Sequence, residues 1–149
     1  MERRGILAFL LGAGALVPAA RAAEPAASRH RVAIQVSSND AATMNLAMNN
    51  ATNAAEFFAS KGESAAVEIV AYGPGLHMLR DDTSPVKPRI AALKEKLPGL
   101  ILSACANTKR GMEKSEGHAI TLIPQATVVP AGVVRLMELQ EQGWSYIRP

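Results

Sequence analysis

The sequence contains little of two residue types, cysteine and the aromatic residues. Cys105 is the only cysteine among 149 residues, so no disulfide can form within one chain. Aromatic residues make up only 4% of the chain, so alanine and aliphatic side chains must fill the core, which suits helices packed closely on a sheet. The thiol of Cys105 is therefore a buried small hydrophobe, an intermolecular link or a reactive group.

Several binding motifs are absent as well. The chain has no glycine-rich phosphate loop of the GxxxxGK or GxGxxG type, so no motif predicts nucleotide binding. It has no Lys/Arg cluster interleaved with aromatic residues, so nucleic acid is not an expected partner. Asp81 and Asp82 are adjacent on a turn and point apart, which favours helix capping by Asp82 or Ser84 over a shared acid–base site. No cofactor is expected.

The apolar run at residues 5–17 is too short to cross a bilayer. It follows Arg3 and Arg4 and precedes small residues that predict cleavage after Ala22. This pattern predicts a secretory signal peptide at residues 1–22 and an exported protein, most simply in a bacterial periplasm, with no membrane attachment after cleavage. Loss of three arginines and one glutamate with this segment lowers the formal net charge from +3 to +1.

The remainder alternates between strand and helix patterns. Residues 23–30 are predicted to be a flexible lead-in, and residues 31–149 one domain. Strands are predicted at residues 31–36, 65–72, 100–104, 125–129 and 144–148. Helices are predicted from the cap at Asn39 or Asp40 to Gly62, from Ser84 and Pro85 to about Leu97, and over residues 107–116 and 133–142. The alternation predicts an α/β fold with a mostly parallel sheet and helices on both faces. Glu68 indicates that the second strand lies at an edge or faces a partner.

Polar residues and glycines follow the predicted strands. Ligands bind beyond the carboxyl ends of parallel strands, so we expect these residues to converge at one edge of the sheet. They are Ser37, Ser38, Asn39 and Asp40 after the first strand, Gly73, Pro74, Gly75 and His77 after the second, Cys105 and Asn107 after the third, and Pro130 and Gly132 after the fourth.

Cys105 is the strongest candidate among them. A thiol between a strand and a helix faces the positive end of the helix dipole, which favours the thiolate and lowers the thiol pKa. His77 is a candidate proton shuttle, and Asn107 or Ser38 could donate hydrogen bonds. An inert, buried cysteine in a non-catalytic binding module is the alternative. A soft-metal site for copper(I) is a further one, with ligands drawn from Cys105, His77, His118, Met78 and Met112.

The chain resembles the DsrE/DsrF-like family, in its exported branch, over almost the whole mature length. The resemblance is carried by the stretches at residues 36–40, 71–79, 104–108 and 133–147, of which the Gly-Pro-Gly-Leu-His loop and the last stretch are the most distinctive. It implies a three-layer α/β/α sandwich with a parallel five-stranded sheet and a homo-oligomer, often a trimer or hexamer.

In this family, the resemblance implies, a cysteine at the end of the third strand carries sulfane sulfur as a persulfide. Cys105 occupies that place, and residues 109–111 resemble the basic-plus-glycine element that follows the cysteine. The leading hypothesis is therefore a periplasmic sulfur carrier that exchanges sulfur with an unidentified donor or acceptor protein. Its expected site consists of Cys105 and His77, with binding residues Ser38, Asn39, Gly75, Asn107 and Arg110.

Overall fold

The computed structural model describes residues 30–149. The predicted signal peptide and all of the predicted lead-in except His30 lie outside the described residues. Five strands form one sheet in the order β4-β3-β2-β1-β5, and every neighbouring pair is parallel. The strands are β1 (His30–Val36), β2 (Ala65–Ala71), β3 (Ile101–Cys105), β4 (Ala126–Val129) and β5 (Ser145–Ile147).

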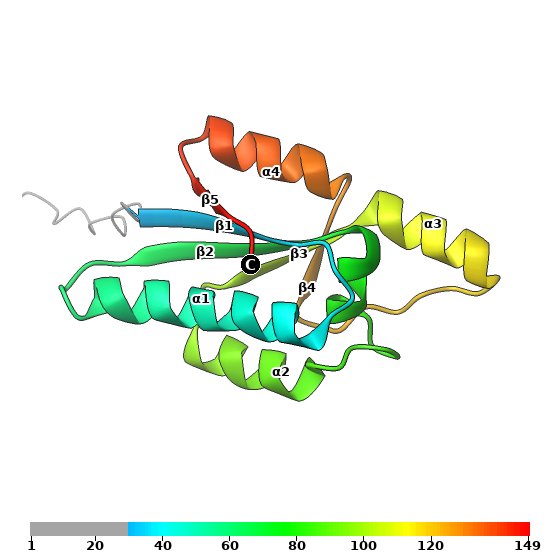
Figure 1. Ribbon diagram of the computed structural model, residues 1–149, viewed down its shortest axis with the longest axis horizontal. Coiled ribbons are helices and arrows are strands. Elements are labelled where there is room, and N and C mark those ends of the chain that lie inside the picture. Colours follow the sequence, from blue (N-terminus) through cyan, green and yellow to red (C-terminus); the bar gives the residue numbers. More distant parts are fainter. Residues whose placement is uncertain (1–29) are drawn as a thin grey trace, which may run out of the picture.

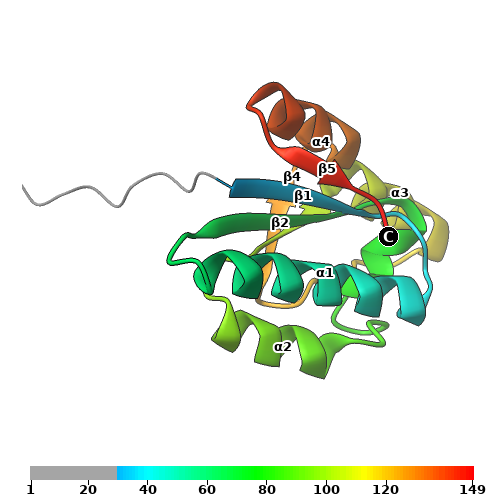
Figure 2. The same cartoon turned by 60° about the vertical axis from the view of Figure 1, so that its left-hand side comes forward.

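Helices cover both faces of this sheet, as Figures 1 and 2 show. The helices α1 (Ala41–Ala59) and α2 (Lys87–Lys96) lie on one face, and α4 (Gly132–Glu141) lies on the other. The helix α3 (Ala106–Glu116) and the short 3-10 helix η1 (Gly73–Leu79) lie beyond the carboxyl ends of the strands. The predicted three-layer α/β/α fold with a parallel five-stranded sheet is confirmed.

The strand order arises because the chain adds strands first on one side of β1 and then on the other. The chain steps outward from β1 through β2 and β3 to β4, and α4 then crosses back over the sheet so that β5 pairs with β1. This return makes β2 the central strand. The prediction that Glu68 marks an edge strand is therefore wrong, because Glu68 lies in β2 and is fully buried beneath α4. A carboxylate is tolerated there because Arg135 and Ser103 supply hydrogen bonds to it.

The core is divided between the two faces. The larger apolar cluster joins the sheet to α1, α2 and η1 and includes Ile34, Met48, Ile69 and Leu79. The smaller one lies under α4 and consists of Ala33, Val70, Leu136 and Leu139, with Tyr72 and Trp144 against it. Alanine, valine, leucine and methionine fill most of both clusters, as the low aromatic content predicts.

The predicted start of the helix after Ser84 is wrong by two residues. The helix α2 begins at Lys87, with Pro88 in its first turn and no side-chain cap. The Ser84 hydroxyl instead donates to the Met78 carbonyl at 2.6 Å, and Asp82 pairs with Arg80 rather than capping a helix. The Ser84 oxygen accepts a hydrogen bond from the Val86 amide at 3.4 Å, but Val86 lies before the first residue of the helix, so this contact does not cap α2.

Candidate functional site

The carboxyl ends of neighbouring strands meet at one edge of the sheet, as expected for parallel strands. The Tyr72 amide donates to the Val36 carbonyl at 3.2 Å, which joins the ends of β1 and β2. The Asn107 amide donates to the Pro130 carbonyl at 3.3 Å, which joins the ends of β3 and β4. The turns that the sequence predicted to converge are therefore held together by main-chain hydrogen bonds.

Cys105 is both the last residue of β3 and the N-cap of α3. Its backbone is extended, with φ −69° and ψ 115°, and its Sγ accepts a hydrogen bond from the Thr108 amide at 3.4 Å. The sulfur thus takes the position of the side-chain oxygen that usually caps a helix. The helix begins at Ala106, one residue before the predicted start, because the cysteine itself is the cap.

A second helix begins at the same sulfur. Gly132 is the first residue of α4 and lies three residues after Val129, which pairs with Cys105. Its main-chain amide, like those of Thr108 and Asn107, lowers the pKa of the Cys105 thiol. The starts of α3 and α4 therefore both present N–H groups to one Sγ atom. Because the amino ends of helices carry partial positive charge, this arrangement stabilises an anion on the sulfur.

Two opposing effects act on the pKa of the Cys105 thiol. Burial raises it, since the residue is only 5% exposed and the charged form loses water. Hydrogen bonds from the Thr108 hydroxyl and from the three amides lower it by more, so the thiol pKa lies below its ordinary value. The Gly73 amide donates to Thr108 Oγ1 at 2.9 Å, which leaves the Thr108 hydroxyl proton for the sulfur.

Two glycines allow these elements to approach so closely. A Cβ at Gly75 would lie 2.2 Å from the Val36 carbonyl oxygen, so no larger residue fits where η1 crosses the end of β1. A Cβ at Gly132 would lie 2.8 Å from the Tyr72 Cβ, where the start of α4 rests on β2. Gly75, predicted as a binding residue, thus contributes through its lack of a side chain.

Three predicted side chains lie at the same edge without joining the thiol. His77 is partly buried in η1, and its Nδ1 lies 2.7 Å from Thr83 Oγ1. Ser38 and Asn39 are exposed in the turn after β1, just before Asp40, which caps α1. Among residues 30–149, no hydrogen bond links His77, Ser38 or Asn39 to Cys105. Their roles in the site stay predictions.

Asn107 and Arg110 lie in the first turns of α3. The Asn107 amide contributes to the thiol environment, whereas its side-chain oxygen accepts a hydrogen bond from the exposed Arg110 guanidinium. Any contribution of Asn107 to the thiol comes from its main chain, and its role as a binding residue stays a prediction.

Thr108 is a site residue that was not predicted from the sequence. It is the third residue after the capping Cys105, the position whose amide normally bonds to an N-cap side chain. That spacing is a signal in the sequence, but it becomes visible only once Cys105 is taken as the cap.

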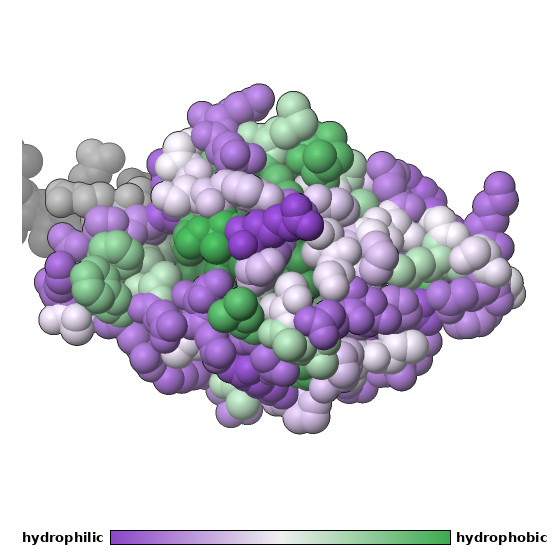
Figure 3. All heavy atoms as spheres, in the orientation of Figure 1, coloured by the Kyte–Doolittle hydropathy of each residue, from purple (hydrophilic) through white to green (hydrophobic). Residues whose placement is uncertain are grey.

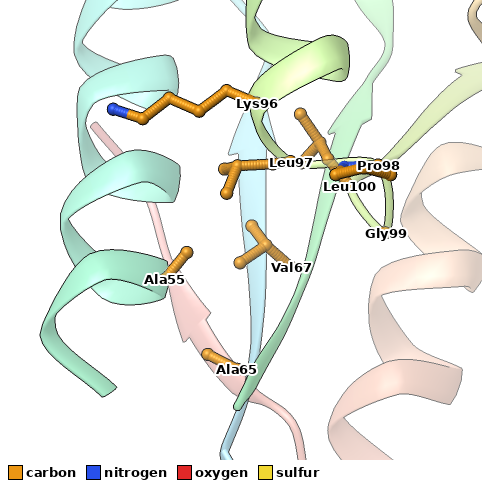
Figure 4. Close-up of a pocket in the computed structure, with 8 residues that line it drawn as sticks. All are labelled: Ala55, Ala65, Val67, Lys96, Leu97, Pro98, Gly99 and Leu100. Atoms are coloured by element: carbon orange, nitrogen blue, oxygen red, sulfur yellow. The ribbon is translucent and has the colours of Figure 1, made fainter. Parts of the chain in front are cut away.

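A cavity of about 170 Å³ lies at the opposite edge of the sheet from the thiol (Figure 4). Ala55 of α1 and Ala65 and Val67 of β2 line it, together with residues 96–100 between α2 and β3. These residues surround the amino ends of the strands and include no cysteine or histidine, so the cavity does not belong to the Cys105 site. A groove nearer the thiol runs along residues 129–131 and α4.

Within the described part of the chain, no group of three or more His, Cys, Asp and Glu side chains is placed to hold a metal ion. Two of the candidate soft ligands are engaged elsewhere: Met78 is buried in the larger apolar cluster, and Met112 Sδ lies 3.7 Å from an Arg80 guanidinium nitrogen. Along residues 30–149, no helix combines the length and the apolar character that a bilayer-spanning segment requires.

A sequence model of the DsrE/DsrF-like family matches residues 30–149. The chain belongs to the DsrE/DsrF-like family. Proteins of this family are often linked to sulfur relay. The match covers the sheet, all the helices and Cys105, so it agrees with the resemblance carried by the sequence motifs.

A solved structure shows the same fold in another protein. It is that of MTH1491 from Methanobacterium thermoautotrophicum, described as a protein of unknown function. It is 30% identical in sequence, with a TM-score of 0.68, and the match covers 80% of this chain and 99% of that one. A comparison with curated proteins gave no match.

Proposed function

We propose that this DsrE-like protein carries sulfane sulfur as a persulfide on Cys105 in the periplasm. The observation that carries the proposal is the environment of one atom: the Thr108 amide donates to the Cys105 sulfur at 3.4 Å, and the Thr108 hydroxyl and the amides of Gly132 and Asn107 also lower the pKa of the thiol. These donors favour the thiolate, which is the nucleophilic form of cysteine. The predicted signal peptide at residues 1–22 supports export.

The chemistry consists of two thiol exchanges and needs no oxidant. The Cys105 thiolate attacks the terminal sulfur of a donor hydropersulfide, R–S–SH. A new S–S bond forms at Cys105, the donor S–S bond breaks, and R–S⁻ leaves with the electron pair. An acceptor thiolate then attacks the outer sulfur of the persulfide, and Cys105 leaves as the thiolate. The same amides that stabilise the thiolate stabilise it as the leaving group.

The limited exposure of Cys105 favours a small-molecule sulfur donor over a folded donor protein. Because Cys105 is 5% exposed, a polysulfide or a small hydropersulfide reaches the sulfur more easily than a folded partner does. The acceptor is then a thiol on a flexible segment or a small molecule. His77 is retained as the proposed proton shuttle and Arg110 as a proposed binding residue at the rim.

The test is mass spectrometry of the protein after incubation with polysulfide. We expect an addition of about 32 daltons per sulfur atom, located on the Cys105 peptide and removed by a reducing agent. The variant Cys105→Ser is the matched control, because it keeps a side chain of similar size without the thiol. An unchanged mass of the native protein, under conditions in which a free cysteine peptide gains sulfur, would rule out the carrier.

The burial of the Cys105 sulfur supports a second candidate function, that of a non-catalytic binding module. A non-catalytic binding module would keep Cys105 as an inert core residue. Alkylation of the native protein separates the two: labelling at neutral pH without denaturant supports the carrier, whereas labelling that requires denaturant supports the module.

We also propose that the protein assembles with copies of itself, as a trimer or hexamer. Three large apolar side chains on α4 face outward, and Figure 3 shows apolar residues gathered over this helix. They are Val133, Val134 and Met137, which are 56%, 47% and 53% exposed. Light scattering measures the mass in solution. The charged substitution Met137→Glu is expected to lower it, and a monomeric native protein would contradict the assembly.

A further inference from the structure

The buried carboxylate of Glu68 is the most unusual charge in the fold. Glu68 lies in the middle of β2, the central strand, and has no exposed surface. Three hydrogen bonds satisfy it. The Ser103 hydroxyl donates to Oε1 at 2.6 Å, and Arg135 donates from Nε to Oε1 and from Nη2 to Oε2, both at 2.7 Å. A charge this deeply buried is costly unless its partner geometry is kept.

The carboxylate ties α4 to the sheet beside the thiol. Arg135 lies in the first turn of α4, three residues after Gly132, and Gly132 itself lies three residues after Val129, which pairs with Cys105. The same helical turn therefore carries the ion pair and the Gly132 amide, which lowers the pKa of the thiol. Ser103 and Cys105 are two residues apart in β3, and because successive side chains of a strand point to opposite faces, these two lie on the same face of the sheet. Glu68, Ser103 and Cys105 thus share the face that α4 covers, which is the upper face in Figure 1.

Two contacts fix where α4 begins. Gly132 rests against Tyr72, where a Cβ would lie 2.8 Å from the Tyr72 Cβ. This contact limits how closely the helix approaches but does not set its rotation. The two parallel bonds from Arg135 to Glu68 restrain it, because side-on pairing through Nε and Nη2 requires the guanidinium and the buried carboxylate to lie in one plane.

We propose that Glu68 is a positioning residue for Cys105: through its bidentate pair with Arg135 it orients the first turn of α4 so that the Gly132 amide points at the sulfur. The inference deepens the proposed function, since it assigns what keeps the sulfur site preorganised. It predicts that a residue without contact to the thiol controls how readily the thiol ionises.

A direct electrostatic effect would act with the opposite sign. A negative charge near the thiol disfavours the thiolate, so removing the Glu68 charge would by itself promote ionisation. Removing the Arg135 charge would by itself disfavour ionisation. Positioning instead requires that loss of either partner disfavours the thiolate, because either loss frees the start of α4. The two explanations therefore differ in the sign of the Glu68 effect.

The test measures the rate of Cys105 alkylation by iodoacetamide over a pH series, using the full exported chain. For Glu68→Gln we expect alkylation at neutral pH to slow by a factor on the order of ten, because one hydrogen bond to the thiolate is weakened. Arg135→Gln is expected to slow it by a similar factor. The double variant is expected to be no slower than either single variant, since both remove the same restraint.

Two further variants make the result decisive. Arg135→Lys keeps the positive charge but loses the paired donors, so positioning predicts slower alkylation and a charge effect predicts no change. Because Arg135 is partly exposed, this variant keeps the test available if Glu68→Gln does not fold. Glu138→Gln is the matched control: it removes an exposed carboxylate 3.8 Å from the same guanidinium, and we expect an unchanged rate.

Faster or unchanged alkylation in Glu68→Gln, or an unchanged rate in Arg135→Lys, would overturn the proposal. The chemical shift of the Gly132 amide proton is a second readout: it should respond to thiol ionisation in the native protein and lose that response in Arg135→Lys. Both measurements concern thiol ionisation alone. A native protein that ionises as described but gains no sulfur would therefore reject the carrier and leave the role of Glu68 intact.

Discussion

The two faces of the sheet differ in what they bury. Under α1 and α2, the sheet buries a large and almost wholly apolar cluster that includes Ile34 and Ile69. Under α4, it buries only a small apolar cluster together with Glu68, Ser103 and the Cys105 thiol. The comparison indicates a division of roles: the first face supplies most of the burial that stabilises the fold, so the second can hold polar groups in fixed positions.

The largest expected effect is a cavity on the α1 and α2 face. Ile69→Ala should lower the free energy of unfolding by roughly 2–5 kcal/mol, because Ile69 is fully buried in the central strand. Urea unfolding measures the loss. Alkylation of Cys105 in the folded protein should keep its native rate, since Ile69 points away from the thiol face. A loss below about 1 kcal/mol would contradict the assignment of stability to this face.

The next largest effect is expected from a steric clash on the α4 face of the sheet. Gly132→Ala places a Cβ 2.8 Å from the Tyr72 Cβ, so α4 must move. We expect a loss of about 1–3 kcal/mol in unfolding free energy together with slower alkylation of Cys105. Gly111→Ala is the matched control, because nothing lies within 4 Å of a Cβ there, and a helix gains about 0.5–1 kcal/mol from the change. Equal effects at both glycines would remove the distinction.

A smaller effect should separate ionisation from stability. Thr108→Val removes the hydroxyl that lowers the pKa of the Cys105 thiol, so the pKa should rise and alkylation at neutral pH should slow several-fold. The unfolding free energy should fall by only about 1 kcal/mol, the usual net value of a hydrogen bond. Thr52→Val, whose hydroxyl donates to the Met48 carbonyl in α1, should leave the alkylation rate unchanged. A rate change of the same size in both variants would show that the effect is not local.

The smallest effect concerns charges outside both faces. Arg80 is buried and pairs with Asp82 and Glu116, which lowers the pKa of Asp82 from 3.8 to about 2 and also lowers that of Glu116. A carboxylate with a lowered pKa adds stability that is complete above its unfolded value of 3.8 and disappears as the pH falls through about 2. The urea midpoint should therefore decrease over that window. In Asp82→Asn, the decrease of the urea midpoint should be shallower. Asp40→Asn is the comparison variant, because the Asp40 carboxylate caps α1 and pairs with no arginine among residues 30–149. An identical pH profile for Asp82→Asn and the native protein would contradict this account.

Most of the fold could be predicted because its signals are local. The five strands follow from short β-rich runs, and the helix start at Asp40 follows from a capping side chain next to its own helix. The start of α2 could not be predicted in this way. Ser84 lies before a proline, as a cap should, but its hydroxyl reaches back to Met78 in η1.

The candidate site was predictable in position but not in mechanism. Placing Cys105 at the end of β3 required only the alternation of strands and helices. The donors to its sulfur come from separate elements, since Gly132 belongs to α4, and the Thr108 hydroxyl is held by Gly73, 35 residues earlier in the chain. His77 illustrates the reverse case: the loop that carries it lies at the correct edge of the sheet, while its imidazole bonds to Thr83.

By itself, the sequence determined the elements, their parallel pairing and the strand end at which the single thiol lies, because hydrophobic period and capping residues act over a few neighbours. Only the tertiary structure decided the strand order and hence the burial of Glu68 in the central strand. It also decided that Glu68 meets Arg135, 67 residues away, and that the starts of two helices meet at one sulfur. These contacts depend on how α4 packs across the sheet, and no local pattern encodes that packing.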